Sequence, residues 1–415
     1  MSVMTLNRKN FKKRENFDKV LLKNYLTIRY NPEEKNSFPM ATWKNFREKN
    51  SDPYGKTTEE FLKKSIITYL SNIKGNIVVS LSSGIDSTLC LGLIRKVFPT
   101  RKIKTICAVF EDGTDESNKA KKISEKFDGD FKVVSFDSIF TSLPELVSIY
   151  GKPRWNTYHH IVAKEAKKYG SVLVTGDGAD EIFAGYTFRY SKFLNLSRPN
   201  DNWKVKTINY LETHNRDWVP DQDQIFGSRI NFDWNEIYNY FRPYFSNPIN
   251  PLQQVLLADF NGKLVFDFIP TGKSIMKKYG LIGAPIFLNS NVINYGLNLK
   301  TNDKYDPKNQ KGKLVLRKIS KRLGIKHIDD KRGFSPDLLI DWEKNGKALM
   351  QNYLFNKNSC IFKKRLINFN WVIRAYEKVA NDGDMRYLSR LISVFALEIW
   401  CRIYITQEIS SKKKL

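Results

Sequence analysis

Hydrophobic residues between positions 57 and 175 follow two alternating patterns along this chain. Continuous apolar runs at residues 77–81, 103–110, 131–136 and 171–175 predict buried strands. The segments around them have helical spacing and predict helices at residues 57–70, 115–127, 143–150 and 157–169, and a further one that ends at residue 98. Strands that alternate with helices build a parallel sheet, because the chain needs a long crossover to return to the same edge. The pattern therefore predicts an α/β fold with a doubly wound parallel sheet.

The pattern changes after residue 186, where helices and aromatic-rich loops replace the alternation. Helical spacing is present at residues 251–265, 311–323, 337–353, 371–379 and 385–405, whereas residues 197–223 are polar and predict a loop. The first 56 residues are polar and weakly periodic, so we expect them to pack on the main body or to remain partly mobile. The chain is therefore expected to have an extension at 1–56, a core at 57–190 and a largely helical C-terminal half at 191–415, which covers the ligand edge of the sheet.

The turn after the first predicted strand is rich in hydroxyl groups. Ser82, Ser83, Gly84 and Ser87 lie between this strand and the helix that follows it. A strand, a short turn and a helix point backbone N–H groups and the helix N-terminus at an anion. Asp86 would repel a bare phosphate, but it can hold a Mg2+ that the phosphate also binds. An ordinary N-capped helix has a similar composition, so this turn alone leaves both interpretations open.

A second turn, after the fourth predicted strand, gathers carboxylates. Gly176 and Gly178 permit close approach of the backbone to a ligand, and Asp177, Asp180 and Glu181 lie within the same six residues. Like charges this close repel each other and persist most easily beside cations or Mg2+. The alternative is a helix start whose acidic residues only complement the helix dipole. Both turns follow parallel strands at their carboxyl ends, where doubly wound sheets bind ligands, and this agreement favours a site.

The composition adds a strongly basic balance to this picture. The 415 residues carry a net charge of +26, which suggests a polyanion partner such as RNA or an anionic membrane face. Lysine and asparagine are spread along the whole chain, so a composition bias explains the excess as well, and RNA is not the favoured partner. No run of about 18 apolar residues predicts a membrane span. The four scattered cysteines and the absence of an apolar leader pattern lead us to expect a reduced, cytoplasmic protein.

Longer stretches around the two turns resemble a known family. Residues 81–87 resemble the pyrophosphate-binding loop of N-type ATP pyrophosphatases, and residues 175–186 resemble the second motif of asparagine synthetase C-terminal domains. The loop alone is shared by many enzymes, whereas the pair, with the predicted strands between its members, is specific. The similarity covers residues 57–405 and includes shorter matches at residues 110–117, 143–153, 331–335 and 397–400.

The resemblance implies an ATP-dependent, amide-forming ligase on a sheet of the adenine-nucleotide alpha-hydrolase type. A substrate carboxylate would attack the α-phosphate of ATP, and ammonia or an amine would then displace AMP from the acyl-adenylate. Asp177 would take a proton from the attacking amine, and Lys331 would stabilise the charge of the transition state. Asp86 and Asp180 would bind Mg2+. A larger set of matched residues, which includes Asp86 again, would hold the nucleotide and its pyrophosphate. These residues are Leu81, Ser82, Ser83, Gly84, Asp86, Ser87, Val109, Gly176 and Lys313.

Two departures from the family pattern leave the substrates open. Asparagine synthetases usually begin with a glutaminase domain whose nucleophile is the cysteine after Met1, but here Ser2 follows Met1. We therefore expect nitrogen to come from free ammonia, a separate glutaminase subunit or an amine-bearing substrate. The family's K-x-D-R-x-S-M element corresponds to residues 270–276, where Gly272 and Lys273 replace its Asp and Arg. The small-molecule carboxylate substrate is therefore not assigned to aspartate.

Two other functions are compatible with the sequence. A tRNA-modifying ATP pyrophosphatase would use the same loop to adenylate a base and would account for the positive charge, but the paired cysteines of its thiolating members are missing. A scaffold protein would keep the fold without catalysis and would have no need of Asp86, Asp177, Asp180 and Glu181. The ligase is the function that accounts for both turns.

Overall fold

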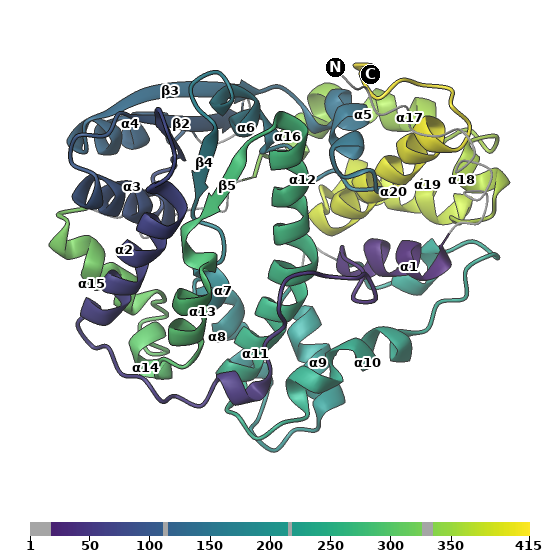
Figure 1. Cartoon of the computed structure of the whole chain (residues 1–415). Helices are drawn as coiled ribbons and strands as arrows, with labels where there is room; N and C mark the ends of the chain where they lie inside the picture. Colours follow the sequence, from purple (N-terminus) through teal and green to yellow (C-terminus); the bar gives the residue numbers. More distant parts are fainter. Residues whose placement is uncertain (1–17, 111–114, 215–217, 326–334) are drawn as a thin grey trace.

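A parallel sheet forms one side of the molecule (Figure 1). The structure is a computed structural model that describes residues 18–110, 115–214, 218–325 and 335–415. Within these residues, five strands pair in the order β3-β2-β1-β4-β5, and every pairing is parallel. The strands are β1 (Ile77–Ser80), β2 (Ile103–Phe110), β3 (Gly129–Phe136), β4 (Val172–Thr175) and β5 (Ile282–Pro285). The predicted parallel sheet and its first four strands are confirmed.

The edge strand β5 was not among the predicted strands. The strand consists of the sequence Ile-Gly-Ala-Pro, which has little of the apolar character of a buried strand. It pairs with β4 along its length, and Pro285 lies opposite Thr175. An edge strand has only one neighbour, so a proline that cannot donate a hydrogen bond is tolerated there.

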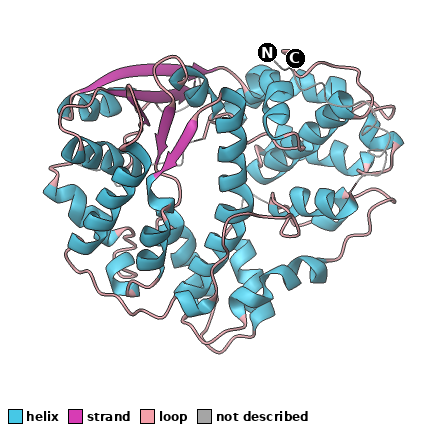
Figure 2. Ribbon diagram, viewed as in Figure 1, coloured by secondary structure: helices cyan, strands magenta, loops and turns pink. Residues whose placement is uncertain are grey.

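Helices cover both faces of the sheet, as a doubly wound fold requires (Figure 2). On one face, α3 (Ile85–Val97) packs on β1 and β4, and α4 (Ser117–Lys126) packs on β2 and β3. On the other face, α6 (His160–Ala166) packs on β2, β3 and β4, and α12 (Ile269–Tyr279) packs on β5. α2 (Lys56–Leu70) forms an outer layer on α3. The α/β class and the doubly wound arrangement predicted from the sequence are confirmed.

The helix predicted to end at residue 265 continues well beyond it. α11 (Pro251–Asp259) passes into a π-helical segment, η5 (Phe260–Phe268), which leads directly into α12. Proline and glycine are unfavourable inside a helix, but Pro270 lies in the first turn of α12, where its missing N–H costs little. The buried face continues through Ile269 and Ile275, and burial of this face outweighs the unfavourable local propensities.

The C-terminal half is helical, as expected, and its central element is α20 (Met385–Tyr404), against which α1 (Lys19–Ile28) packs. The polar segment 197–223 is not a loop throughout, because α9 (Trp203–Glu212) lies within it and buries Tyr210. The other helices of the described residues are α5 (Ile139–Tyr150), α7 (Ala179–Phe183), α8 (Thr187–Leu196), α10 (Trp234–Phe245), α13 (Ser290–Leu297), α14 (Thr301–Lys304), α15 (Leu314–Arg322), α16 (Leu338–Asp341), α17 (Lys347–Leu354), α18 (Cys360–Lys363) and α19 (Phe369–Asp382), with short 3-10 turns η3 (Trp43–Asn45), η4 (Gln222–Ile225) and η6 (Ile286–Leu288) and a π-helical turn η7 (Trp342–Gly346).

Among the helices that the structure describes, none combines the length and the apolar character needed to cross a membrane. The division at residues 56 and 190 stays a prediction.

Candidate active site

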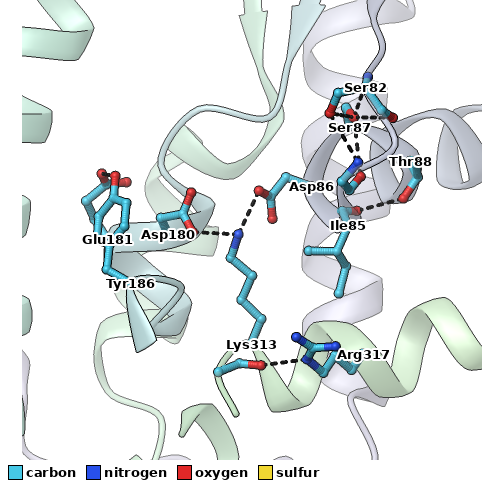
Figure 3. Close-up of polar contacts among 12 residues, drawn as sticks. Ser82, Ile85, Asp86, Ser87, Thr88, Asp180, Glu181, Tyr186, Lys313 and Arg317 are labelled. Carbon is cyan, nitrogen blue, oxygen red and sulfur yellow. Dashed lines mark hydrogen bonds and ion pairs between the residues drawn. The ribbon is translucent and has the colours of Figure 1, made fainter. Parts of the chain in front are cut away.

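The hydroxyl-rich turn connects the central strand β1 to α3. Ser87 Oγ accepts a hydrogen bond from Ser82 N at 3.0 Å, and Gly84 N donates to Ser82 Oγ at 3.2 Å. These bonds tie the turn to the first residues of α3, as Figure 3 shows for Ser82 and Ser87. Leu81, only 2% exposed, anchors the start of the turn in the core. The turn therefore holds a fixed shape beside the N-terminus of a buried helix, which favours an anion.

A carboxylate already binds to this turn from the neighbouring strand's loop. Ser83 N donates to Glu116 Oε2 at 2.9 Å, and Ser83 Oγ donates to the same oxygen. Glu116 was not predicted as a site residue, although it follows β2, the strand next to β1, by only a few positions. The contact shows that the N–H and hydroxyl of Ser83 are oriented to donate to an oxyanion.

The acidic turn lies directly against the first one, because β4 is the neighbour of β1. A Cβ built on Gly176 would lie 2.8 Å from Asp86 Cβ, so only glycine permits this approach. Gly178 has a φ of 89° and precedes α7, which carries Asp180 and Glu181. The chain order in the sheet reverses between β1 and β4, and ligands of doubly wound sheets bind at such a reversal. The structure thus brings the two sequence motifs together.

Lys313 bridges the carboxylates of the two motifs (Figure 3). Its Nζ lies 2.7 Å from Asp86 Oδ2 and 2.6 Å from Asp180 Oδ1, and the residue is 8% exposed. Burial alone would lower the pKa of the Lys313 amine, but the Asp180 and Asp86 carboxylates outweigh burial and raise this pKa above its ordinary value. Lys313 N also donates to Phe183 O at 3.0 Å, which fixes the start of α15 against the end of α7.

The carboxylates of Asp86 and Asp180 fit a Mg2+ ion. Both reach one cationic atom, the Nζ of Lys313, so both also reach a single metal ion in that region. Magnesium is commonly held by one or two carboxylates together with substrate phosphates. Gly185 keeps the space beside Asp180 and Lys313 free of a side chain. A Cβ at this position would lie 1.6 Å from Asp180 Oδ1 and 2.4 Å from Lys313 Cε. The structure brings together the two carboxylates that were predicted to bind Mg2+, and their role as metal ligands stays a prediction.

The other two carboxylates of the acidic turn have different surroundings. Asp177 is exposed and accepts a hydrogen bond from Thr175 Oγ1 at 2.8 Å. Glu181 is 2% exposed and accepts a hydrogen bond from Tyr186 at 2.6 Å. Burial, and then repulsion from Asp180, raise the pKa of Glu181 to about 8. Both effects favour the neutral form of the Glu181 carboxyl.

A buried ion pair between Arg189 and Asp259 lies close enough to Glu181 for the Asp259 charge to act on it. Arg189 Nη2 lies 2.6 Å from Asp259 Oδ1, and Tyr210 donates to the same oxygen at 2.7 Å. The Arg189 guanidinium also lies over the ring of Tyr186, 5.0 Å from its centroid. This network was not predicted, because Arg189, Tyr210 and Asp259 come from three separate helices and have no local motif.

Two predicted site residues stand apart from this cluster. Val109 is half-buried near the carboxyl end of β2, opposite Ser135 of β3. It lies on the strand next to β1, and its contact with a nucleotide stays a prediction. Lys331 and the residues around it lie outside the described residues, so its role also stays a prediction.

A doubly wound sheet with an anion-binding turn and paired carboxylates at its switch point places this chain among the nucleotide-binding α/β folds. The sequence pattern of asparagine synthase matches residues 61–402, and the chain belongs to that family. Membership confirms the resemblance found in the sequence and agrees with a fold of the adenine-nucleotide alpha-hydrolase type.

Curated relatives share short regions with this chain. Asparagine synthetase [glutamine-hydrolyzing] 1 of Bacillus subtilis is 34% identical over 122 residues, which are 28% of this chain and 19% of that protein. A putative asparagine synthetase [glutamine-hydrolyzing] of Mycobacterium bovis is 37% identical over 127 residues, or 29% of this chain and 19% of that protein. The chain thus spans about a fifth of the length of these relatives. Both are named as synthetases, in line with the predicted ligase class.

Solved structures with partial similarity include two other synthetases. An NH3-dependent NAD synthetase from Campylobacter jejuni has a TM-score of 0.25 at 14% identity, over 40% of this chain and 90% of that chain. An NMN synthetase from Francisella tularensis has a TM-score of 0.25 at 16% identity, over 56% of this chain and 94% of that chain.

Proposed function

We propose that this chain is an ATP-dependent ligase that joins a carboxylate to ammonia or an amine, with release of AMP and pyrophosphate. The observation that carries the proposal is the junction of Asp86, Lys313 and Asp180 at the switch point, beside a turn that already binds an oxyanion. Membership in the asparagine synthase family supports the same reaction type. Activation of a carboxylate by ATP needs hydrogen-bond donors for the phosphates and carboxylates for a metal ion. The turn after β1 offers such donors, and Asp86 and Asp180 offer such carboxylates.

The turn between β1 and α3 would hold the pyrophosphate part of ATP. Ser83 N and Oγ now donate to Glu116, and a phosphate oxygen would take the place of that carboxylate. Leu81, Val109 and Gly176 would line the nucleotide, and Lys313 would lie beside its phosphates. Lys313 keeps its proton at neutral pH, because the pKa of its amine is raised by its two carboxylate partners.

Asp86 and Asp180 would hold the Mg2+, which would supply positive charge to the phosphates of ATP. The substrate carboxylate oxygen forms a bond to the α-phosphorus, and the bond from that phosphorus to pyrophosphate breaks. The amine nitrogen then forms a bond to the acyl carbon, the carbon–oxygen bond breaks and AMP leaves. Asp177 would accept the proton that the amine loses. Lys331 would stabilise the negative charge of the transition state.

The substrate carboxylate is not assigned to aspartate. Lys273 stands where the family carries an arginine, and its Nζ donates to Ser37 Oγ at 3.0 Å. The relatives are named as glutamine-hydrolysing, but we propose free ammonia, a separate glutaminase subunit or an amine-bearing substrate as the nitrogen source here. The four cysteines are free and buried, in agreement with a reducing compartment, and we expect the reaction to take place in the cytoplasm.

The test is pyrophosphate release with a panel of carboxylates, in the presence of ATP, Mg2+ and ammonium. The wild type is expected to respond to at least one carboxylate, and Asp86→Ala is expected to lose most of that response. Asp382→Ala is the matched control, because it removes an exposed carboxylate from α19. Equal rates for the wild type and Asp86→Ala would contradict the assignment.

A further inference from the structure

A basic pocket lies in the C-terminal half of the molecule. It is lined by Ser228, Arg229, Lys363, Lys364 and Arg365 and has a volume of about 540 Å3. Small-molecule sites commonly have volumes in this range. In Figure 1, α18, which ends at Lys363, lies on the other side of α12 from α3 and β4. The basic pocket is therefore separate from the candidate active site.

The walls of the basic pocket are two segments that are distant in sequence but held together by backbone hydrogen bonds. Gly227 N donates to Leu366 O at 2.9 Å, and Arg229 N donates to Arg365 O at 3.1 Å. A Cβ on Gly227 would lie 2.4 Å from Arg365 O, so glycine is needed for this approach. Arg365 has a φ of 54°, in the left-handed region that L residues seldom adopt. Backbone hydrogen bonds therefore fix the positions of the two segments that carry the cationic side chains.

The described residues that line the basic pocket carry charges of one sign. Arg229, Lys363, Lys364 and Arg365 contribute cations, and no carboxylate is among its described lining residues. Lys363 and Arg365 are exposed, and neither forms an ion pair within the part of the chain that the structure describes. Like charges held close together repel each other, and a bound anion turns this repulsion into attraction.

We propose that the basic pocket binds the phosphate groups of a phosphorylated ligand. The forked donors of Arg365 match two oxygens of a phosphate, Lys363 adds a point charge and Ser228 adds a hydroxyl. The pocket is larger than a single phosphate ion, so there is room for the group that carries it. The same phosphate chemistry is present in a small molecule and in the backbone of RNA, and the two sources can be separated by experiment.

The test compares three full-length proteins by isothermal titration calorimetry. They are the wild type, the pocket variant Lys363→Ala/Arg365→Ala, and the control Lys412→Ala/Lys413→Ala, which removes two exposed lysines from the C-terminal segment. One arm uses inorganic phosphate, and the other uses a short single-stranded oligouridylate at two salt concentrations. Any phosphate bound at the turn between β1 and α3 contributes equally, because that turn is unchanged in all three proteins.

The pocket variant is expected to bind more weakly than the wild type by about tenfold or more in at least one arm, whereas the control binds like the wild type. A loss in the inorganic phosphate arm indicates a small phosphorylated ligand. A loss confined to the oligouridylate arm, with a reduced dependence on salt, indicates an RNA backbone. Equal affinities of the pocket variant and the control in both arms, or no binding by the wild type, overturn the proposal.

Discussion

The Lys313 bridge permits a quantitative prediction about stability. Lys313→Met removes the cation and keeps much of the apolar stem, so the Asp86 and Asp180 carboxylates stay close together without the amine that bridges them. Breaking a fully buried pair costs about 3–5 kcal/mol. The side chains of Asp86 and Asp180 are 23% and 33% exposed, so water screens part of their repulsion. We therefore expect Lys313→Met to lower the free energy of unfolding by about 2 kcal/mol, below the fully buried value.

The assay is urea unfolding at pH 7, with and without Mg2+. Because the pKa of Lys313 is raised, the contribution of its charge to the free energy of unfolding is fully present at neutral pH. This contribution is lost only as the pH rises through the pKa that Lys313 has in the folded protein. Mg2+ is expected to stabilise Lys313→Met more than the wild type, because the metal no longer competes with an amine for the two carboxylates. Lys321→Met, which changes an exposed lysine on the same helix, is the control.

The reasoning would be refuted by either of two results. One is an unfolding midpoint for Lys313→Met in metal-free buffer that equals that of the wild type. The other is an equal shift of both proteins on addition of Mg2+, which would show that Asp86 and Asp180 do not form the metal site.

Three further predictions concern the surroundings of the site. Gly176→Ala would force the two motifs apart, and we expect a loss of about 1–3 kcal/mol in the free energy of unfolding together with loss of most of the activity. In the control Gly272→Ala, the new Cβ meets nothing within 4 Å on helix α12. This variant should instead be more stable than the wild type by about 0.5–1 kcal/mol in urea unfolding. Asp259→Asn leaves the Arg189 charge buried without its partner, so a loss of about 3–5 kcal/mol is expected by thermal or urea unfolding, and a loss below 1 kcal/mol would contradict this. Glu181 has a folded pKa of about 8, above its unfolded value, so wild-type stability should fall as the pH rises from about 5 to 8, and Glu181→Gln should flatten this profile.

The site could be predicted from sequence as far as it depends on strand order. Asp86 and Asp180 each follow a buried apolar run, and parallel strands bring their carboxyl ends to one edge, so their proximity was foreseeable. Lys313 was assigned to the phosphates, but its direct contact with both carboxylates depends on how α15 docks against α7. The matched stretch 110–117 includes Glu116, but the match alone did not show that its carboxylate contacts Ser83.

The elements that were missed lacked a hydrophobic pattern of their own. β5 is an edge strand of small residues that is fixed by its pairing with β4. α9 begins at an N-cap, Asn202, within a stretch whose polar composition concealed the buried face of Tyr210. In both cases tertiary contacts, rather than periodicity, decide the structure.

The central claim is that a substrate carboxylate attacks the α-phosphorus of ATP at this switch point. The most direct measurement uses the carboxylate that best stimulates pyrophosphate release, labelled with oxygen-18 in its carboxyl group, and follows the label by mass spectrometry. The mechanism predicts one labelled oxygen in the AMP, because the acyl carbon–oxygen bond breaks when the amine attacks. Unlabelled AMP formed together with the amide product would contradict it.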